Sequence, residues 1–242
     1  MSIPHITAFI LFPVLVVLLE LGRRVRVHRK VEAKSSAIES AVFALFGLLL
    51  AFSFSGAMTR YDMHRDLVVQ ETNSIGTAYL RLDLLPASSQ PALRQLFRDY
   101  TSSRLHLYDT DAPEISPQSI QLQHEIWEQS VRACSASGAS PDAARLLLPA
   151  LNNMIDITAT RQNVFDMHPP LIVDALLFGI SCWCAFIAGY SMPATNWLYI
   201  FTFAFVVTFT ISAIMEIEYP REGLIRLTHT DRNLIDLQNS MK

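Results

Sequence analysis

Four long apolar segments constrain the fold of this chain more than any other feature. They lie at about 3–21, 37–58, 170–190 and 196–215. An α-helix rises about 1.5 Å per residue, so roughly 20 apolar residues cross a hydrocarbon core about 30 Å thick. The chain is 51% hydrophobic and only 17% charged, whereas a typical soluble domain carries about 25% charged residues. The sequence therefore predicts an all-α membrane protein with four transmembrane helices.

The long region between the second and third segments is predicted to be a helical extramembrane domain. No proline and no strong helix breaker occurs between Arg60 and Leu85, so the second helix should continue past the membrane into this domain. Ser116-Pro117 and Ser140-Pro141 each place a capping residue before a proline at the first helical position. Two further helices are expected to begin there.

These boundaries divide the chain into four parts. The first part holds the first two transmembrane helices and their basic connecting loop, and the others are the helical domain, the last two transmembrane helices and a C-terminal tail. Their expected bounds are 1–58 with the loop at 23–34, 59–169, 170–217 and 218–242.

The basic loop indicates an orientation in a bacterial inner membrane. Residues 23–34 contain six Lys or Arg, and short loops rich in these residues stay on the cytoplasmic side. The helical domain would then be periplasmic. Arg60, Arg65 and Arg161 flank the membrane on the opposite side, so charge asymmetry favours this orientation by a small margin.

Composition and motifs argue against several classes of function. The net charge is −3 and the basic residues form no long face, so nucleic acid is not an expected partner. The cysteines and histidines lack metal-ligand spacing, and the eight glycines form no phosphate-binding loop. We therefore expect no metal, no cofactor, no catalytic residues and no enzymatic activity. Membrane lipid and further copies of the chain are the expected partners.

A stripe of small side chains runs along the second apolar segment. Small residues allow helix backbones to approach closely in lipid, where burial of apolar surface no longer drives association. The stripe repeats at spacings of three and four, which places it on one helix face. We predict that it is a helix-packing face. Its members are Ser40, Ala44, Gly47, Ala51 and Ser55.

A bulky apolar row lies beside that stripe, formed by Phe43, Phe46, Leu50 and Phe54. If several copies of this helix surrounded an axis, the row would form stacked hydrophobic rings that can gate a pore by dewetting. The alternative is that the row faces lipid or the protein core, as on most apolar helices. Two ionisable residues near the segments, Arg60 and Asp174, are the candidates for an ion path, because charge within hydrocarbon is costly and tends to mark function.

The stretch 46–86 resembles the bestrophin-like domain family of bacterial membrane proteins, which is distantly similar to the bestrophin anion channels. The second span there runs directly into a charged helix and then into a segment with glutamate and asparagine. Later blocks at 148–152 and 219–225 look like further parts of the same family, so the similarity covers nearly the whole chain. The matching residues in the first block are Arg60, Tyr61, Asp62, Glu71, Asn73, Ile75 and Leu80.

The resemblance implies a function and an assembly. Bestrophins are pentameric anion channels whose second helix supplies a narrow hydrophobic neck, which Phe46, Leu50 and Phe54 would form here. Paired tryptophans follow the corresponding arginine in bestrophins, whereas Tyr61 and Asp62 follow it in this chain. Bestrophins also keep their large domain cytoplasmic.

Two functions from different classes follow. The first is an oligomeric ion channel for inorganic anions, with a hydrophobic constriction on the second transmembrane helix. The second is a non-conducting, membrane-anchored structural or signalling module whose helical domain binds a partner. Such a module would present an exposed apolar patch on its domain.

Overall fold

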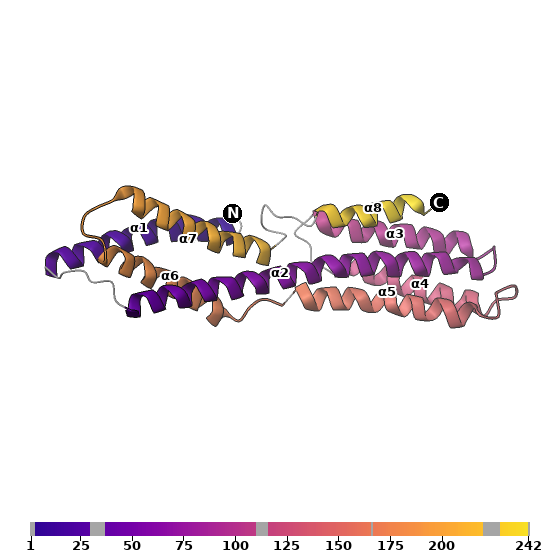
Figure 1. The fold of residues 1–242 in the computed structure, drawn as a ribbon. Coiled ribbons are helices and arrows are strands. Elements are labelled where there is room, and N and C mark those ends of the chain that lie inside the picture. The colour runs from indigo at the N-terminus through magenta and orange to yellow at the C-terminus, as the bar shows by residue number, and fades with distance from the viewer. Residues whose placement is uncertain (1–2, 30–36, 110–115, 166, 220–227, 242) are drawn as a thin grey trace. The chain divides into compact units, whose positions relative to one another are not determined.

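The computed structural model describes residues 3–29, 37–109, 116–165, 167–219 and 228–241, and these residues form an all-α fold (Figure 1). Four of the helices are long and apolar enough to cross a membrane, as the sequence predicts. Helices α3, α4 and α5 lie in the chain between the second and third of them. The elements are α1 (Ile3–Arg29), α2 (Ala37–Leu80), η1 (Arg81–Leu84), α3 (Gln90–Asp109), α4 (Pro117–Cys134), α5 (Ala143–Phe165), α6 (Leu171–Tyr190), α7 (Trp197–Glu218) and α8 (Thr228–Ser240).

Helix α2 is much longer than a membrane crossing requires. It has 44 residues, which at about 1.5 Å per residue gives a length of about 66 Å. Its apolar part, 37–58, is followed without interruption by the charged stretch that begins at Arg60. The prediction that the second transmembrane helix continues beyond the membrane is confirmed.

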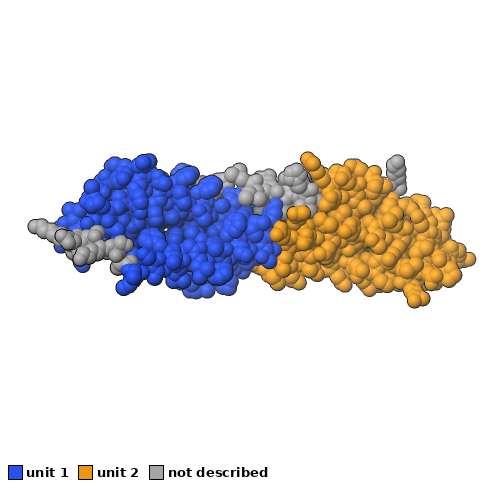
Figure 2. Space-filling model, viewed as in Figure 1, with its two compact units in different colours: residues 1–61, 168–226 blue, residues 62–167, 227–242 orange. Residues whose placement is uncertain are grey.

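The chain forms two compact units, coloured separately in Figure 2. The apolar unit comprises residues 1–61 and 168–226, and the helical domain comprises 62–167 and 227–242. The C-terminal segment, expected as a tail, contains α8; Leu234 of this helix and Met241 directly after it are buried in the core of the helical domain. The C-terminal part of the chain therefore contributes to that domain.

Helices α1 and α6 make the closest backbone approach in the apolar unit. A Cβ added to Gly189 would lie 1.9 Å from the carbonyl oxygen of Leu19, and one added to Gly22 would lie 2.1 Å from that of Phe186. Both distances are far shorter than any real contact, so only glycine allows the two helices to pack this closely. Small residues at such crossings are typical of membrane helices.

Helix α2 joins the apolar unit along one face. Its Phe46 is buried in the cluster that α1, α6 and α7 share, and Phe43 meets Phe203 of α7 edge to face, with 6.4 Å between ring centroids. Further along, Ala57 packs with Ile214 and Ile217 of α7. One side of α2 is therefore covered by α7 from its first turns to the end of its apolar part.

The helical domain has its own core, to which every one of its helices contributes. Ser116 caps α4 as the sequence predicts, because its hydroxyl accepts a hydrogen bond from the backbone N–H of Ser119 at 3.1 Å. Helix α8 lies along α3 (Figure 1). Large buried side chains of this core are Ile75, Leu82, Leu93, Phe97, Tyr100, Ile126, Leu147, Leu151, Met154 and Leu234.

Candidate functional site

The small-residue stripe of α2 lies on the face that the other described residues leave uncovered. All five of its members are exposed: Ser40, Ala44, Gly47, Ala51 and Ser55. A Cβ added to Gly47 would meet no atom of the described residues within 4 Å. The close helix crossing within this chain is instead the one between α1 and α6. The stripe is therefore available to a further helix from outside the chain.

The predicted constriction row is divided between the two faces of α2. Phe46 is buried, and Phe43 and Leu50 are half-buried against the cluster of α1, α6 and α7. Phe54 is exposed. Three of the four candidates thus pack within their own chain, and Phe54 alone of the four lies outside that packing.

Bulky residues that the row did not include are also exposed on the apolar part of α2, namely Ile38, Leu45, Leu48 and Phe52. Leu48 is 51% exposed and Phe52 is 67% exposed. They follow Ala44 at successive steps of four residues, which keeps them on one side of the helix. The sequence could not single them out, because it does not show which face of α2 meets α7; in the structure Phe43, Phe46 and Leu50 form that face, opposite Leu48.

The ion-path candidate Arg60 is held by an acidic residue of α7. Its Nε donates to Glu218 Oε1 at 2.7 Å and its Nη2 donates to Glu218 Oε2 at 2.7 Å. The Glu218 side chain is only 4% exposed. This two-pronged geometry is the strong form of an arginine–carboxylate pair. Arg60 therefore fastens the end of the apolar part of α2 to the end of α7.

The other candidate, Asp174, belongs to the same group of charges. It lies in the first turn of α6 and interacts electrostatically with Glu218, Arg60 and His168. His168 Nδ1 lies 3.8 Å from Glu218 Oε1, and its ring stacks on Tyr219 at 4.9 Å between centroids. The structure therefore brings both sequence candidates together at one end of the apolar unit.

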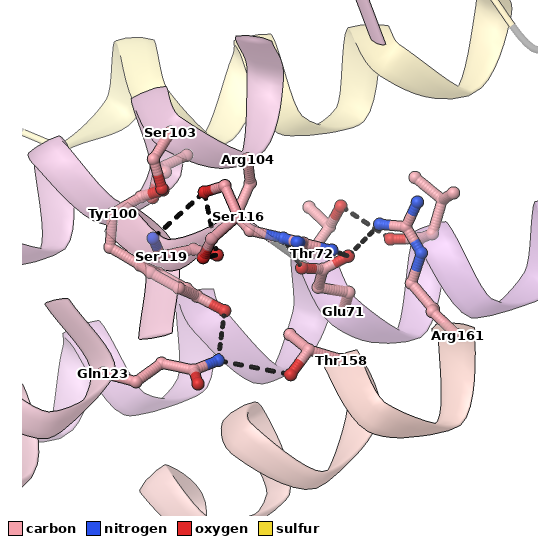
Figure 3. A network of polar contacts seen from close by, with 12 residues as sticks. Glu71, Thr72, Tyr100, Ser103, Arg104, Ser116, Ser119, Gln123, Thr158 and Arg161 are labelled. Carbon is pink, nitrogen blue, oxygen red and sulfur yellow. Dashed lines mark hydrogen bonds and ion pairs between the residues drawn. The ribbon is translucent and has the colours of Figure 1, made fainter. Parts of the chain in front are cut away.

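A second group of charges is buried in the helical domain, around Glu71 of α2 (Figure 3). Arg104 Nε of α3 donates to Glu71 Oε1 at 2.6 Å, and Arg161 Nη1 of α5 donates to Glu71 Oε2. The three side chains are between 0% and 6% exposed. One carboxylate thus ties three helices together and accepts hydrogen bonds from two guanidinium groups.

The electrostatics of this triad follow from burial and the two arginines. Burial alone would raise the pKa of Glu71, but the adjacent guanidinium groups of Arg161 and Arg104 outweigh it and hold the pKa below its ordinary value. Nearby, the Tyr100 hydroxyl accepts from Gln123 Nε2 at 3.0 Å, and Gln123 also donates to the Thr158 hydroxyl at 3.2 Å (Figure 3). Burial, reinforced by the charge of Glu71, raises the pKa of Tyr100.

Neither group of charges suggests a metal centre. Within the described ranges, no three His, Cys, Asp or Glu side chains lie close enough together to hold a metal ion. Both groups instead join helices through arginine and glutamate.

The overall arrangement defines a class of protein. Four long apolar helices, with a helical domain built from the segment between the second and third, characterise an α-helical multi-pass membrane protein. The model of the Bestrophin-like domain matches residues 7–231. The chain belongs to this bestrophin-like family.

Solved structures agree with the family at the level of the fold. A bacterial bestrophin homolog from Klebsiella pneumoniae, in a tryptophan-to-alanine variant, matches with a TM-score of 0.75 and 13% identity over 99% of this chain and 100% of that chain. A structure of such a homolog phased on zinc matches with a TM-score of 0.71 and 14% identity over 97% and 98% of the two chains. No curated protein matches the sequence.

Proposed function

We propose that this protein is a homo-oligomeric ion channel in which the uncovered faces of α2 from several copies surround a central pore. The observation that carries the proposal is the asymmetry of α2. One face packs on α7, while the other presents small residues from Ser40 to Ser55 together with the exposed Leu48 and Phe52. Small side chains allow neighbouring helices to approach closely in lipid, and bulky apolar ones can narrow an aqueous path.

The constriction that we propose is formed by exposed side chains of α2. Phe54 remains a candidate from the sequence, and Leu48 and Phe52 join it because they are bulky, exposed side chains that follow Ala44 of the small-residue stripe at steps of four residues. Phe43, Phe46 and Leu50 would support the pore helix from behind through their packing in the apolar unit. Rings of such apolar residues can gate a pore by dewetting.

The preference for anions rests on the family. The Klebsiella pneumoniae structures carry the description of bestrophin homologs, and bestrophins are pentameric anion channels. The exposed face of α2 from Ser40 to Thr59 carries no charged side chain, so it imposes no strong selection by itself. Arg60 would act by fixing α2 against α7, since its guanidinium is paired with the carboxylate of Glu218.

We further propose that the membrane is a bacterial inner membrane and that the helical domain is periplasmic. In the apolar unit, Arg26 at the basic end of α1 bonds the carbonyl of Ser191 in the turn between α6 and α7. The basic residues of 23–29 and this turn therefore share one side, which the positive-inside rule makes cytoplasmic. A helical domain on the cytoplasmic side, as in bestrophins, would contradict this orientation.

Flux through liposomes tests the proposal. Purified protein is reconstituted, and chloride and sodium fluxes are followed with ion-sensitive dyes. We expect chloride flux in the wild type, and a clear change of that flux in Leu48→Ala, Phe52→Ala and Phe54→Ala. The matched control is Phe9→Ala on α1, whose side chain is 77% exposed. Absence of flux from well-folded protein, or equal effects of all four substitutions, would refute the channel.

The second candidate, a non-conducting module that binds a partner, is favoured by one feature of the helical domain. Leu80 at the end of α2 is 69% exposed, and Leu146 of α5 is also exposed. Arg81 donates to the carbonyl of Leu146, which joins the two helix ends. If this apolar patch is a partner site, the double variant Leu80→Ser, Leu146→Ser should lose partner binding. Neither the wild type nor this variant should then conduct ions.

A further inference from the structure

A groove lies between α2 and α5 within the helical domain. The two helices run side by side (Figure 1) and are joined in the core by the ion pair of Glu71 and Arg161. The groove has a volume of about 430 Å³, and small-molecule sites occupy about 300–1,000 Å³. One face of each helix lines it, at spacings of three and four residues. Its polar lining residues are Gln70, Asn73 and Ser74 of α2 and Asn153, Asp156 and Thr160 of α5.

The polar groups of this groove are almost all unused within the helical domain. The side chains of Gln70, Asn73, Ser74, Asn153 and Asp156 make no hydrogen bond or ion pair with any other described residue. The Thr160 hydroxyl donates to the backbone carbonyl of Asp156 at 3.0 Å, so its oxygen can still accept. Two helices therefore turn unpaired amide, hydroxyl and carboxylate groups toward one space.

The chemistry of the lining disfavours two classes of ligand. Among the described lining residues, the one charged side chain is Asp156, and a carboxylate repels an anion. Ile157 is the one apolar member and is 9% exposed, whereas sites for apolar ligands are lined mainly by hydrophobic and aromatic side chains. The lining therefore suits a ligand that carries many hydrogen-bonding groups and no negative charge.

The balance of donors and acceptors narrows this choice further. Three carboxamides and two hydroxyls line the groove, and each of these groups can both donate and accept. The hydroxyls of a sugar also donate and accept, so they can pair with both ends of a carboxamide. A carboxylate accepts only, and two neighbouring sugar hydroxyls can donate to it together. An ammonium group, which has no acceptor, would leave the carboxamide N–H groups unused.

We propose that the groove between α2 and α5 binds a neutral sugar. Asn73 and Asn153 bond its hydroxyls from the two helices, and Asp156 accepts from two neighbouring hydroxyls. Ile157 offers a small apolar surface to the C–H groups of the ring. The site uses no residue of the proposed pore, so it stands or falls separately from ion conduction.

Saturation-transfer NMR, which detects weakly bound ligands, tests the site on the full-length protein. The protein is kept in a detergent without a sugar headgroup, and glucose, galactose and mannose are titrated. We expect saturable binding of at least one hexose with a dissociation constant on the order of millimolar, since neutral hydrogen bonds in contact with water are individually weak.

Two sets of variants locate the site. The double variant Asn73→Ala, Asn153→Ala should bind the hexose about tenfold more weakly, because each lost hydrogen bond is worth a factor of about two to ten. Both side chains are exposed and unbonded within the described structure, so the domain should still fold. The matched control is Asn152→Ala, because Asn152 is an exposed neighbour on α5 that does not line the groove.

Charged probes define the class of ligand. Glucuronate, a hexose with an added carboxylate, should bind more weakly than the neutral hexose because Asp156 repels it. Asp156→Asn removes that charge and should narrow the difference between the two. Putrescine, a diamine without hydroxyls, should bind more weakly than the hexose.

Several results would overturn the proposal. If none of the three hexoses binds saturably, the groove is a solvated surface or is covered by another copy of the chain. Putrescine binding as tight as that of the hexose would make it a cation site. Equal affinities in the wild type and the double variant, or an equal loss in Asn152→Ala, would place the sugar elsewhere. Should the double variant fail to purify, an unchanged preference for the hexose over glucuronate in Asp156→Asn would contradict the site.

Discussion

Replacement of Glu71 by glutamine should destabilise the helical domain strongly. The carboxylate is fully buried and receives hydrogen bonds from Arg104 and Arg161, which are themselves buried. Glutamine keeps the shape of the side chain but removes the negative charge, so two buried guanidinium groups lose the carboxylate that they share. Breaking a buried pair in this way costs about 3–5 kcal/mol.

The chain contains a matched control. Glu128 and Arg132 on α4 also form an ion pair, at 3.2 Å, but their side chains are 69% and 72% exposed. Exposed pairs contribute about 0–1 kcal/mol, so Glu128→Gln should have almost no effect. The two substitutions make the same chemical change and differ in burial.

Thermal denaturation in detergent is a suitable assay, followed by near-ultraviolet circular dichroism in a background with Trp183→Phe and Trp197→Phe, so that Trp127 of this domain is the remaining tryptophan. At about 2–4 °C per kcal/mol for a chain of this size, Glu71→Gln should lower Tm by about 6–20 °C, and Glu128→Gln by less than about 4 °C. A triple variant with methionine at positions 71, 104 and 161 should recover much of the loss, because no unpaired charge remains. Equal, small shifts in both single variants would refute the reasoning.

Three further predictions follow from particular contacts. Stability should fall as pH drops below about 4.3, the ordinary value for glutamate. The lowered pKa of Glu71 contributes its full stability above the unfolded pKa and loses it progressively as pH falls toward the folded pKa; an acid titration of Tm checks this, and Glu71→Gln should flatten it. Gly189→Ala should destabilise the apolar unit by at least about 1–3 kcal/mol, since its Cβ would overlap Leu19, whereas Gly179→Ala, with open space around it among the described residues, should be tolerated in the same Tm measurement. Thr208→Val should leave stability unchanged or raise it by about 1 kcal/mol in that assay, because the buried Thr208 hydroxyl has no hydrogen-bond partner within the described structure.

The parts of the fold set by long periodic patterns could be predicted from sequence. The four apolar segments, the continuation of α2 into a charged helix and the cap at Ser116 depend on local length, composition and capping chemistry. These signals act within one helix and need no knowledge of the neighbours. The packing between helices was harder, since the close crossing involves Gly22 and Gly189, two isolated glycines in separate segments.

The buried charges were missed, although a signal for them exists in the sequence. Arg104 follows Leu93, Phe97 and Tyr100 at the spacing of the buried face of α3, and Glu218 follows Ile211 and Ile214 in the same way on α7. A single charged residue at the next position of an apolar stripe is therefore a sign of a buried ion pair. Which partner it meets depends on the tertiary fold, which no periodicity specifies.

The prediction of one constriction row on α2 failed for the same reason, because it also depended on the tertiary fold. Bulky and small residues alternate around this helix, and the sequence alone does not reveal which side α7 covers. Phe43 and Phe46 were therefore grouped with Phe54 as one row, whereas the structure packs the first two within the chain and leaves the third exposed.

Cross-linking between copies tests most directly whether the uncovered face of α2 surrounds an axis. In a background without the native Cys134, Cys182 and Cys184, single cysteines are placed at Phe52 and, as a control, at Phe9 of α1. Residues at a narrow axis lie close to their own copies, whereas residues on an outer surface do not. We predict that mild oxidation of membranes links Phe52→Cys into covalent dimers and leaves Phe9→Cys monomeric on a denaturing gel. Dimers from Phe9→Cys, with none from Phe52→Cys, would contradict the proposed pore.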